Sequence, residues 1–163
     1  MTMAPTPPQG SAFRKNLFGL KVDRNTAALP QTTAAPIFTV AGGRVLVTGL
    51  IGEVTTAIQN QANNTKLIAN PTTGSDVDLC AVVDVANLEV GGKLSITPDL
   101  DATPFSVALD KQLAGAIPIG FGAKALCVAA GTIDLSCAAS NTGSVKWSLF
   151  YVPLDDGATV TAA

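Results

Sequence analysis

Histidine is absent from the 163 residues of the chain. Without an imidazole group, the chain cannot build the serine–histidine or cysteine–histidine pairs that activate nucleophiles. It also lacks the commonest general base and the commonest side-chain ligand of zinc and iron. An enzyme made from this sequence would have to use paired carboxylates, a lysine base or a metal ion held by oxygen atoms.

Charged and aromatic residues are also scarce. Only 13% of the residues are charged and 5% are aromatic, whereas 47% are hydrophobic. The core must therefore be built from Val, Ile, Leu and Ala. A β-rich chain with so few charges leaves strand edges that are prone to pair with other chains. One resolution is that much of the surface is covered in an assembly. The other is a surface rich in Thr, Ser, Asn and Gly, which also tolerates water.

The three cysteines, Cys80, Cys127 and Cys137, form no recognisable framework. An odd number leaves at least one thiol unpaired, and no pair has the two-residue spacing of zinc ligands. We expect reduced core thiols in a protein made in the cytoplasm, although a Cys127–Cys137 bridge stays open. The N-terminus has no apolar signal segment, and the longest apolar runs are too short to cross a bilayer. We therefore expect no membrane partner.

Two pairs of carboxylates are spaced for a common strand face: Asp76 with Asp78, and Asp99 with Asp101. Such pairs can act as acid and base in glycoside cleavage. A sugar-binding cleft usually contains several aromatic rings, however, and this chain has one Trp and one Tyr. Carboxylates that simply face solvent explain the spacing better than a hydrolase site.

The segment Asp155-Asp156-Gly157 offers oxygen atoms that calcium prefers. The alternating acidic loop of an EF-hand is missing, so a polar turn is the better interpretation. The glycine-rich segments match neither a phosphate-binding loop nor a dinucleotide fingerprint. We predict no catalytic residues, no cofactor and no metal site.

Period-two alternation is clearest in residues 131–163. Apolar residues at alternate positions lie on each side of a polar turn at residues 141–143, which predicts a half-buried β-hairpin. The inward set before the turn is Ile133, Leu135 and Cys137. The inward set after it is Val145, Trp147, Leu149 and Tyr151.

The same alternation recurs through the rest of the chain. Asp76–Val85 alternates without interruption and predicts one strand, and Gly49 and Gly52 within another strand indicate a bulge or a close backbone approach. In total we expect about nine or ten short strands separated by turns. The predicted fold class is all-β: an antiparallel β-sandwich or jelly-roll-like domain with an extended N-terminal arm.

We place that arm at residues 1–36 and the β-body at residues 37–163. Several prolines occur along the arm, and proline disfavours both a helix and a central strand. Residues 1–24 contain four basic residues and one acidic residue, whereas the remainder contains six and eleven. Four cations are too few to make a nucleic-acid surface. We expect the arm to bind a partner through Phe13, Arg14, Lys15, Leu17, Phe18, Lys21 and Arg24, and the body to fold without it.

Two segments resemble pieces of virion structural proteins of tailed bacteriophages. They are residues 50–81 (LIGEVTTAIQNQANNTKLIANPTTGSDVDLCA) and residues 131–163 (GTIDLSCAASNTGSVKWSLFYVPLDDGATVTAA). Proteins of this kind are generally β-rich and coat, decorate or project from the capsid or tail. The resemblance includes no active-site motif, so it implies no catalytic residues.

The resemblance implies a non-enzymatic capsid decoration, or cement, protein. It would be made in the host cytoplasm and would bind the lattice of the major capsid protein on the virion surface. Its body would form a homo-oligomer such as a trimer. The alternative is a tail- or fibre-associated jelly-roll module that binds a host-surface glycan through Trp147, Tyr151 and nearby Asp residues.

Overall fold

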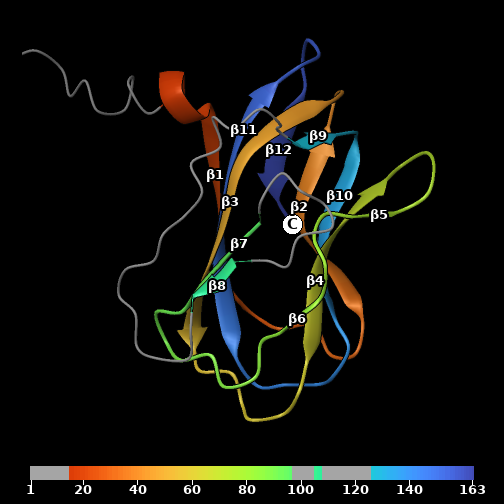
Figure 1. Ribbon diagram of the computed structural model, residues 1–163. Helices are drawn as coiled ribbons and strands as arrows, with labels where there is room; N and C mark the ends of the chain where they lie inside the picture. The colour runs from red at the N-terminus through yellow and green to blue at the C-terminus, as the bar shows by residue number, and fades with distance from the viewer. Residues whose placement is uncertain (1–14, 97–104, 108–125) are drawn as a thin grey trace, which may run out of the picture.

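The computed structural model describes residues 15–96, 105–107 and 126–163. Its strands form two six-stranded antiparallel sheets that pack face to face (Figure 1). The prediction of an antiparallel β-sandwich is therefore confirmed. The inner faces of the two sheets enclose a single apolar core.

The first sheet, called sheet A, has the strand order β1-β11-β3-β7-β8, and β9 also pairs with β3. Its longest contact joins β3 to β11 over ten residue pairs. The strands are β1 (Leu20–Ala28), β3 (Val45–Thr56), β7 (Lys93–Ser95), β8 (Phe105–Val107), β9 (Leu126–Val128) and β11 (Ser144–Pro153).

The second sheet, sheet B, has the order β12-β2-β10-β4-β5, and β6 also pairs with β4. The central strand β10 pairs with β2 on one side and with β4 on the other. The strands are β2 (Ala34–Ala41), β4 (Asn64–Pro71), β5 (Val77–Asp78), β6 (Val83–Asp84), β10 (Gly131–Cys137) and β12 (Thr159–Ala162).

The predicted alternation at the C-terminal end is confirmed, but the predicted hairpin is wrong. The two inward sets, 133/135/137 and 145/147/149/151, are all buried. The strands β10 and β11 do not pair with each other, because β10 belongs to sheet B and β11 to sheet A. Residues 138–143 carry the chain from one sheet to the other, so the two apolar rows face each other across the core. Alternation fixes which side of each strand is buried and says nothing of which strands are neighbours.

The continuous strand predicted over Asp76–Val85 is also wrong. Only two short pieces, β5 and β6, pair with β4, and the chain between them leaves the sheet. Val77 is 48% exposed, whereas Leu79 and Val85 are buried. The irregular segment therefore buries selected residues without keeping a strand's period.

The three cysteines are all free. Cys80 and Cys137 lie in the core, where burial raises the pKa of both thiols. Cys127 is exposed on β9. The expected core thiols are found at two positions, and the bridge between Cys127 and Cys137 does not form.

The structure differs from the expected arm between residues 15 and 36. Residues 15–18 form a helical turn, and β1 then pairs antiparallel with β11. No proline falls within β1, and Pro36 lies in β2 next to an irregularity in the β2–β10 register. A bulged position tolerates the missing N–H of proline. Residues 1–14 of the arm lie outside the described residues.

The expected close backbone approach is confirmed at Gly52, where β3 pairs with Trp147 of β11. A Cβ atom added at Gly52 would lie 2.8 Å from the indole ring of Trp147. At Gly49 the added atom would lie 3.5 Å from the ring of Phe150, which is an ordinary contact. The expected bulge lies beside Gly49, where the β3–β11 register shifts between Phe150 and Tyr151.

We predict that Gly52→Ala destabilises the fold by roughly 1–3 kcal/mol, because the new methyl group overpacks the core against Trp147. Gly49→Ala is the matched control. It should change the free energy of unfolding by less than about 1 kcal/mol, because the new methyl group makes only an ordinary contact and alanine suits a strand better than glycine. The single tryptophan, Trp147, reports unfolding in denaturant by its fluorescence. Equal stability of the two variants would contradict the close approach.

A second prediction concerns the N-terminal boundary. Removal of residues 1–14 should leave the melting temperature almost unchanged. Removal of residues 1–36 deletes β1 and the start of β2, and it uncovers Trp147 and Leu149 at the edge of β11. The shorter chain should aggregate or lose cooperative unfolding in a thermal melt monitored by circular dichroism. A cooperative melt at the temperature of the full chain would show that β1 adds nothing to the body.

Candidate functional site

The outer face of sheet A carries the candidate functional site. Alternate residues of β11 point away from the core and line this face: Lys146, Ser148, Phe150 and Val152. Residues of β1 and β3 that pair with them complete the surface. One end of the face is charged and the other is apolar.

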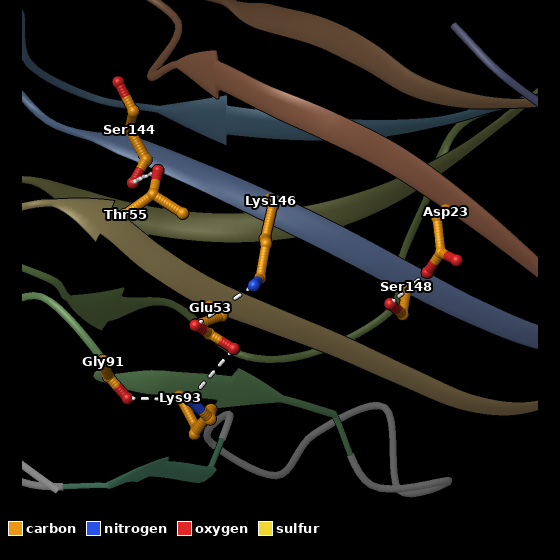
Figure 2. Close-up of polar contacts among 8 residues, drawn as sticks. All are labelled: Asp23, Glu53, Thr55, Gly91, Lys93, Ser144, Lys146 and Ser148. Carbon is orange, nitrogen blue, oxygen red and sulfur yellow. Dashed lines mark hydrogen bonds and ion pairs between the residues drawn. The ribbon is translucent and has the colours of Figure 1, made fainter. Parts of the chain in front are cut away.

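The charged end is centred on Glu53 of β3, which lies between two lysines (Figure 2). Its carboxylate oxygens lie 3.1 Å from Lys93 Nζ and 3.2 Å from Lys146 Nζ. The Lys93 ammonium group also donates to the carbonyl oxygen of Gly91, at 2.9 Å. Burial alone would raise the pKa of Glu53, but the hydrogen bonds from both lysines outweigh it and lower that pKa.

A second polar group lies further along the face, between β1 and β11. Asp23 pairs with Lys21 Nζ at 2.7 Å and accepts a hydrogen bond from the Ser148 hydroxyl (Figure 2). The hydrogen bonds from Lys21 and then from Ser148 lower the pKa of Asp23. Carboxylates with lowered pKa values are poor general bases at neutral pH. Both carboxylates are therefore held in the ionised form as partners of lysine ammonium groups.

The apolar end of the face consists of Phe18, Leu46, Phe150 and Val152. Phe18 and Phe150 pack with ring centroids 5.7 Å apart. Val152 pairs with Leu46 on β3, and its side chain is 39% exposed. Phe18, Leu46 and Phe150 are half-buried, so each keeps part of its surface open to solvent. Apolar residues that gather on an outer face in this way commonly mark an interaction surface.

Phe18 reaches this face because of the helical turn before β1. Gly19 donates to the Lys15 carbonyl oxygen at 2.9 Å and has a φ of +84°, which ends the turn. A Cβ atom at Gly19 would lie 2.2 Å from the Tyr151 carbonyl oxygen, so only glycine fits here. Thr48, at the bulge in β3, donates to the carbonyl oxygen of Phe18. These contacts fix the point at which the N-terminal segment joins sheet A.

The structure brings together some of the predicted arm residues. Phe18 and Lys21 both lie beside Phe150, since Lys21 Nζ is 6.0 Å from that ring's centroid. Lys15 is exposed and Leu17 is half-buried. Arg24 lies apart, where its Nε atom donates to the Ala163 carbonyl oxygen at 3.1 Å. Phe13 and Arg14 lie outside the described residues.

The candidate carboxylate pairs are not assembled into a site in the part of the chain described. Asp78 is exposed and forms an ion pair with Lys66, at 2.7 Å. Asp76 is exposed, and Asp99 and Asp101 lie outside the described residues.

The acidic turn after β11 pairs with an arginine that lies directly before β3. Both Asp155 carboxylate oxygens accept hydrogen bonds from the Arg44 guanidinium group, and the Arg44 backbone N–H donates at 2.7 Å. These bonds lower the pKa of Asp155 to about 2. The turn interpretation of residues 155–157 therefore gains a specific partner, which ties the turn to the start of β3.

The aromatic residues of the glycan-binding alternative are not on the surface. Trp147 and Tyr151 are only 2% and 4% exposed. A cavity of about 60 Å³ beside Trp147, bordered by Arg24, Ile37 and Leu135, is too small for a sugar ring. Neither aromatic side chain can present a face to a glycan in this fold.

Sequence reasoning missed Phe150 and Val152, although a signal was present. In a half-buried strand, the residues between the inward positions should be polar. Lys146 and Ser148 follow that rule, and Phe150 and Val152 break it. Glu53 and Lys93 carried no comparable signal, because their pairing depends on strand neighbours distant in the sequence.

We predict that Arg44→Gln raises the pKa of Asp155 from about 2 toward the ordinary value of 3.8. In the native chain this lowered pKa stabilises the fold at neutral pH, and the contribution disappears as the pH falls toward 2. Carboxyl chemical shifts in an NMR titration measure the change, with Lys66→Gln as a distant control. An unchanged Asp155 titration in Arg44→Gln would contradict the assignment.

Among residues 15–96, 105–107 and 126–163, no helix is long and apolar enough to cross a bilayer. Within the same ranges, no three His, Cys, Asp or Glu side chains are placed to hold a metal ion. Comparison with protein-family models, with curated proteins and with solved structures finds no match for this chain. Its function must therefore be inferred from its own residues and geometry.

Proposed function

We propose that the chain is a non-enzymatic virion structural protein of the capsid decoration type, which binds the lattice of the major capsid protein. One observation carries this proposal. The N-terminal segment joins the body on the outer face of sheet A, beside the apolar end formed by the half-buried Phe18, Leu46 and Phe150 and the exposed Val152. Arm and body therefore offer one continuous contact surface.

Binding would bury the apolar end against a capsid subunit. Covering the part of these side chains that is still exposed contributes roughly 25 cal/mol per Å² of apolar surface. A few residues at the centre of a contact commonly carry most of its binding energy. The helical turn that begins at Lys15 lies at this end of the face. Phe13 and Arg14, which precede it in the sequence, would extend the contact to a neighbouring subunit. The ion pairs around Glu53 would set orientation more than affinity.

Such attachment stabilises the capsid by linkage. A protein that binds the assembled lattice and not the free subunits shifts the equilibrium toward assembly. No chemistry is needed for this role, which suits a face whose carboxylates are held as low-pKa partners of lysines. The virion surface is the proposed location, and synthesis takes place in the host cytoplasm.

The test combines location with a matched pair of variants. Virions of the phage that encodes this protein are probed with an antibody against the protein. The antibody should label the head surface uniformly. Heads lacking the protein are then incubated with the full chain or with Val152→Asp. A charge within the apolar end should weaken binding at least about tenfold in co-sedimentation.

Val77→Asp is the control, because Val77 is similarly exposed, at 48%, and lies on β5 of sheet B. It should bind heads as the native chain does. Labelling of the tail alone would contradict the decoration proposal. Equal binding by the two variants would show that the contact surface lies elsewhere.

A further inference from the structure

The edge strand β1 stands out among the strands that end the two sheets. It has nine residues, whereas the other terminal strands, β8, β12 and β5, have three, four and two. Within the described residues, β11 is the only strand that pairs with β1. A long edge leaves a row of backbone N–H and C=O groups that can pair with another strand.

Natural proteins commonly guard such an edge with charges. On β1, the outward charges are Lys21 and Asp23, two residues apart on the outer face, with 42% and 59% of their side chains exposed. Charges of one sign would repel a second copy of the same strand in any register. Charges of opposite sign at this spacing permit one arrangement in which each faces its opposite.

We propose that β1 pairs with β1 of a second copy of this chain, antiparallel and centred on Val22, to form a two-fold dimer. In this register Lys21 lies opposite Asp23 of the second copy, and Asp23 lies opposite its Lys21. Opposite charges in direct cross-strand positions stabilise a sheet, and like charges destabilise it. The two Lys21–Asp23 pairs, one within each separate copy, are then exchanged for two pairs across the interface.

Direction and length of the contact follow from the same strand. A parallel, in-register pairing would place Lys21 opposite Lys21 and is disfavoured. The β1–β11 register is irregular between Arg24 and Ala27, so the regular edge covers residues 20–24. Leu20, which is 37% exposed, and the half-buried Val22 would lose solvent contact in the dimer.

This inference stands apart from the proposed function, because it depends on β1 and not on any capsid. It favours a two-fold dimer over the trimer considered from the sequence. Since paired residues share a face in an antiparallel ladder, the outer faces of both sheets A would lie on the same side of the dimer.

Charge exchange in the full chain tests the proposal. Sedimentation equilibrium should give a dimer for the native chain. Lys21→Asp alone and Asp23→Lys alone should each weaken self-association roughly tenfold or more, because like charges then face each other twice. The double exchange, Lys21→Asp with Asp23→Lys, restores complementarity and should restore the dimer.

The mixture of the two single variants is the sharpest arm of the test. The two carboxylates on β1 of the Lys21→Asp chain would face the two ammonium groups on β1 of the Asp23→Lys chain. The mixture should therefore form a heterodimer, although neither variant pairs with itself. Thermal melts confirm that each variant is folded.

Three results would overturn the proposal. The first is a native chain that stays monomeric up to roughly 1 mM. The second is an unchanged dimer in both single variants, and the third is a lack of association in their mixture.

Discussion

The packing of Trp147 against Gly52 is the constraint on which the rest of sheet A depends. The two residues pair directly in the β3–β11 ladder, and the indole ring occupies the space that any larger side chain at position 52 would need. Trp147 also pairs with Arg24 on β1, so this one residue takes part in the ladders on both sides of β11. Because side chains alternate along a strand, fixing Trp147 in the core also fixes which residues of β11 face outward.

The outward residues follow from that parity, and they explain why one face of the protein differs from the other. On β11 the outward row changes from charged to apolar along its length, and the helical turn before β1 adds Phe18 at the apolar end. The chain enters the sandwich there, held by the contacts of Gly19 and Thr48. The apolar end and the start of β1 thus lie together on the outer face of sheet A, which does not pack against sheet B. Their shared location supports the proposal that this face attaches to a larger surface.

Much of the fold could be predicted from the sequence because burial in a sandwich has a local signature. Alternation identified the inward residues of β10 and β11, and glycine within an apolar run indicated the close approach at Gly52. Strand pairing could not be predicted, since residues 131–151 are equally compatible with a hairpin and with a crossing between sheets. Only the neighbours, which are far away in sequence, distinguish the two. The candidate site was likewise predictable only in part. Phe150 and Val152 break the alternation and so carry a local signal, whereas the Glu53–Lys93 pair depends on contacts across the sheet. The sequence did not indicate β1, because prolines lie on either side of it. Those prolines led to the prediction of a single arm over residues 1–36.

We propose that the outer face of sheet A is the surface that meets the partner. Hydrogen–deuterium exchange of the full chain, free and bound to heads that lack it, measures this directly. The account predicts slower exchange on binding in peptides that cover residues 15–28 and 144–153, with little change in β2, β4 and β10. Protection confined to sheet B, with residues 15–28 and 144–153 unchanged, would contradict it.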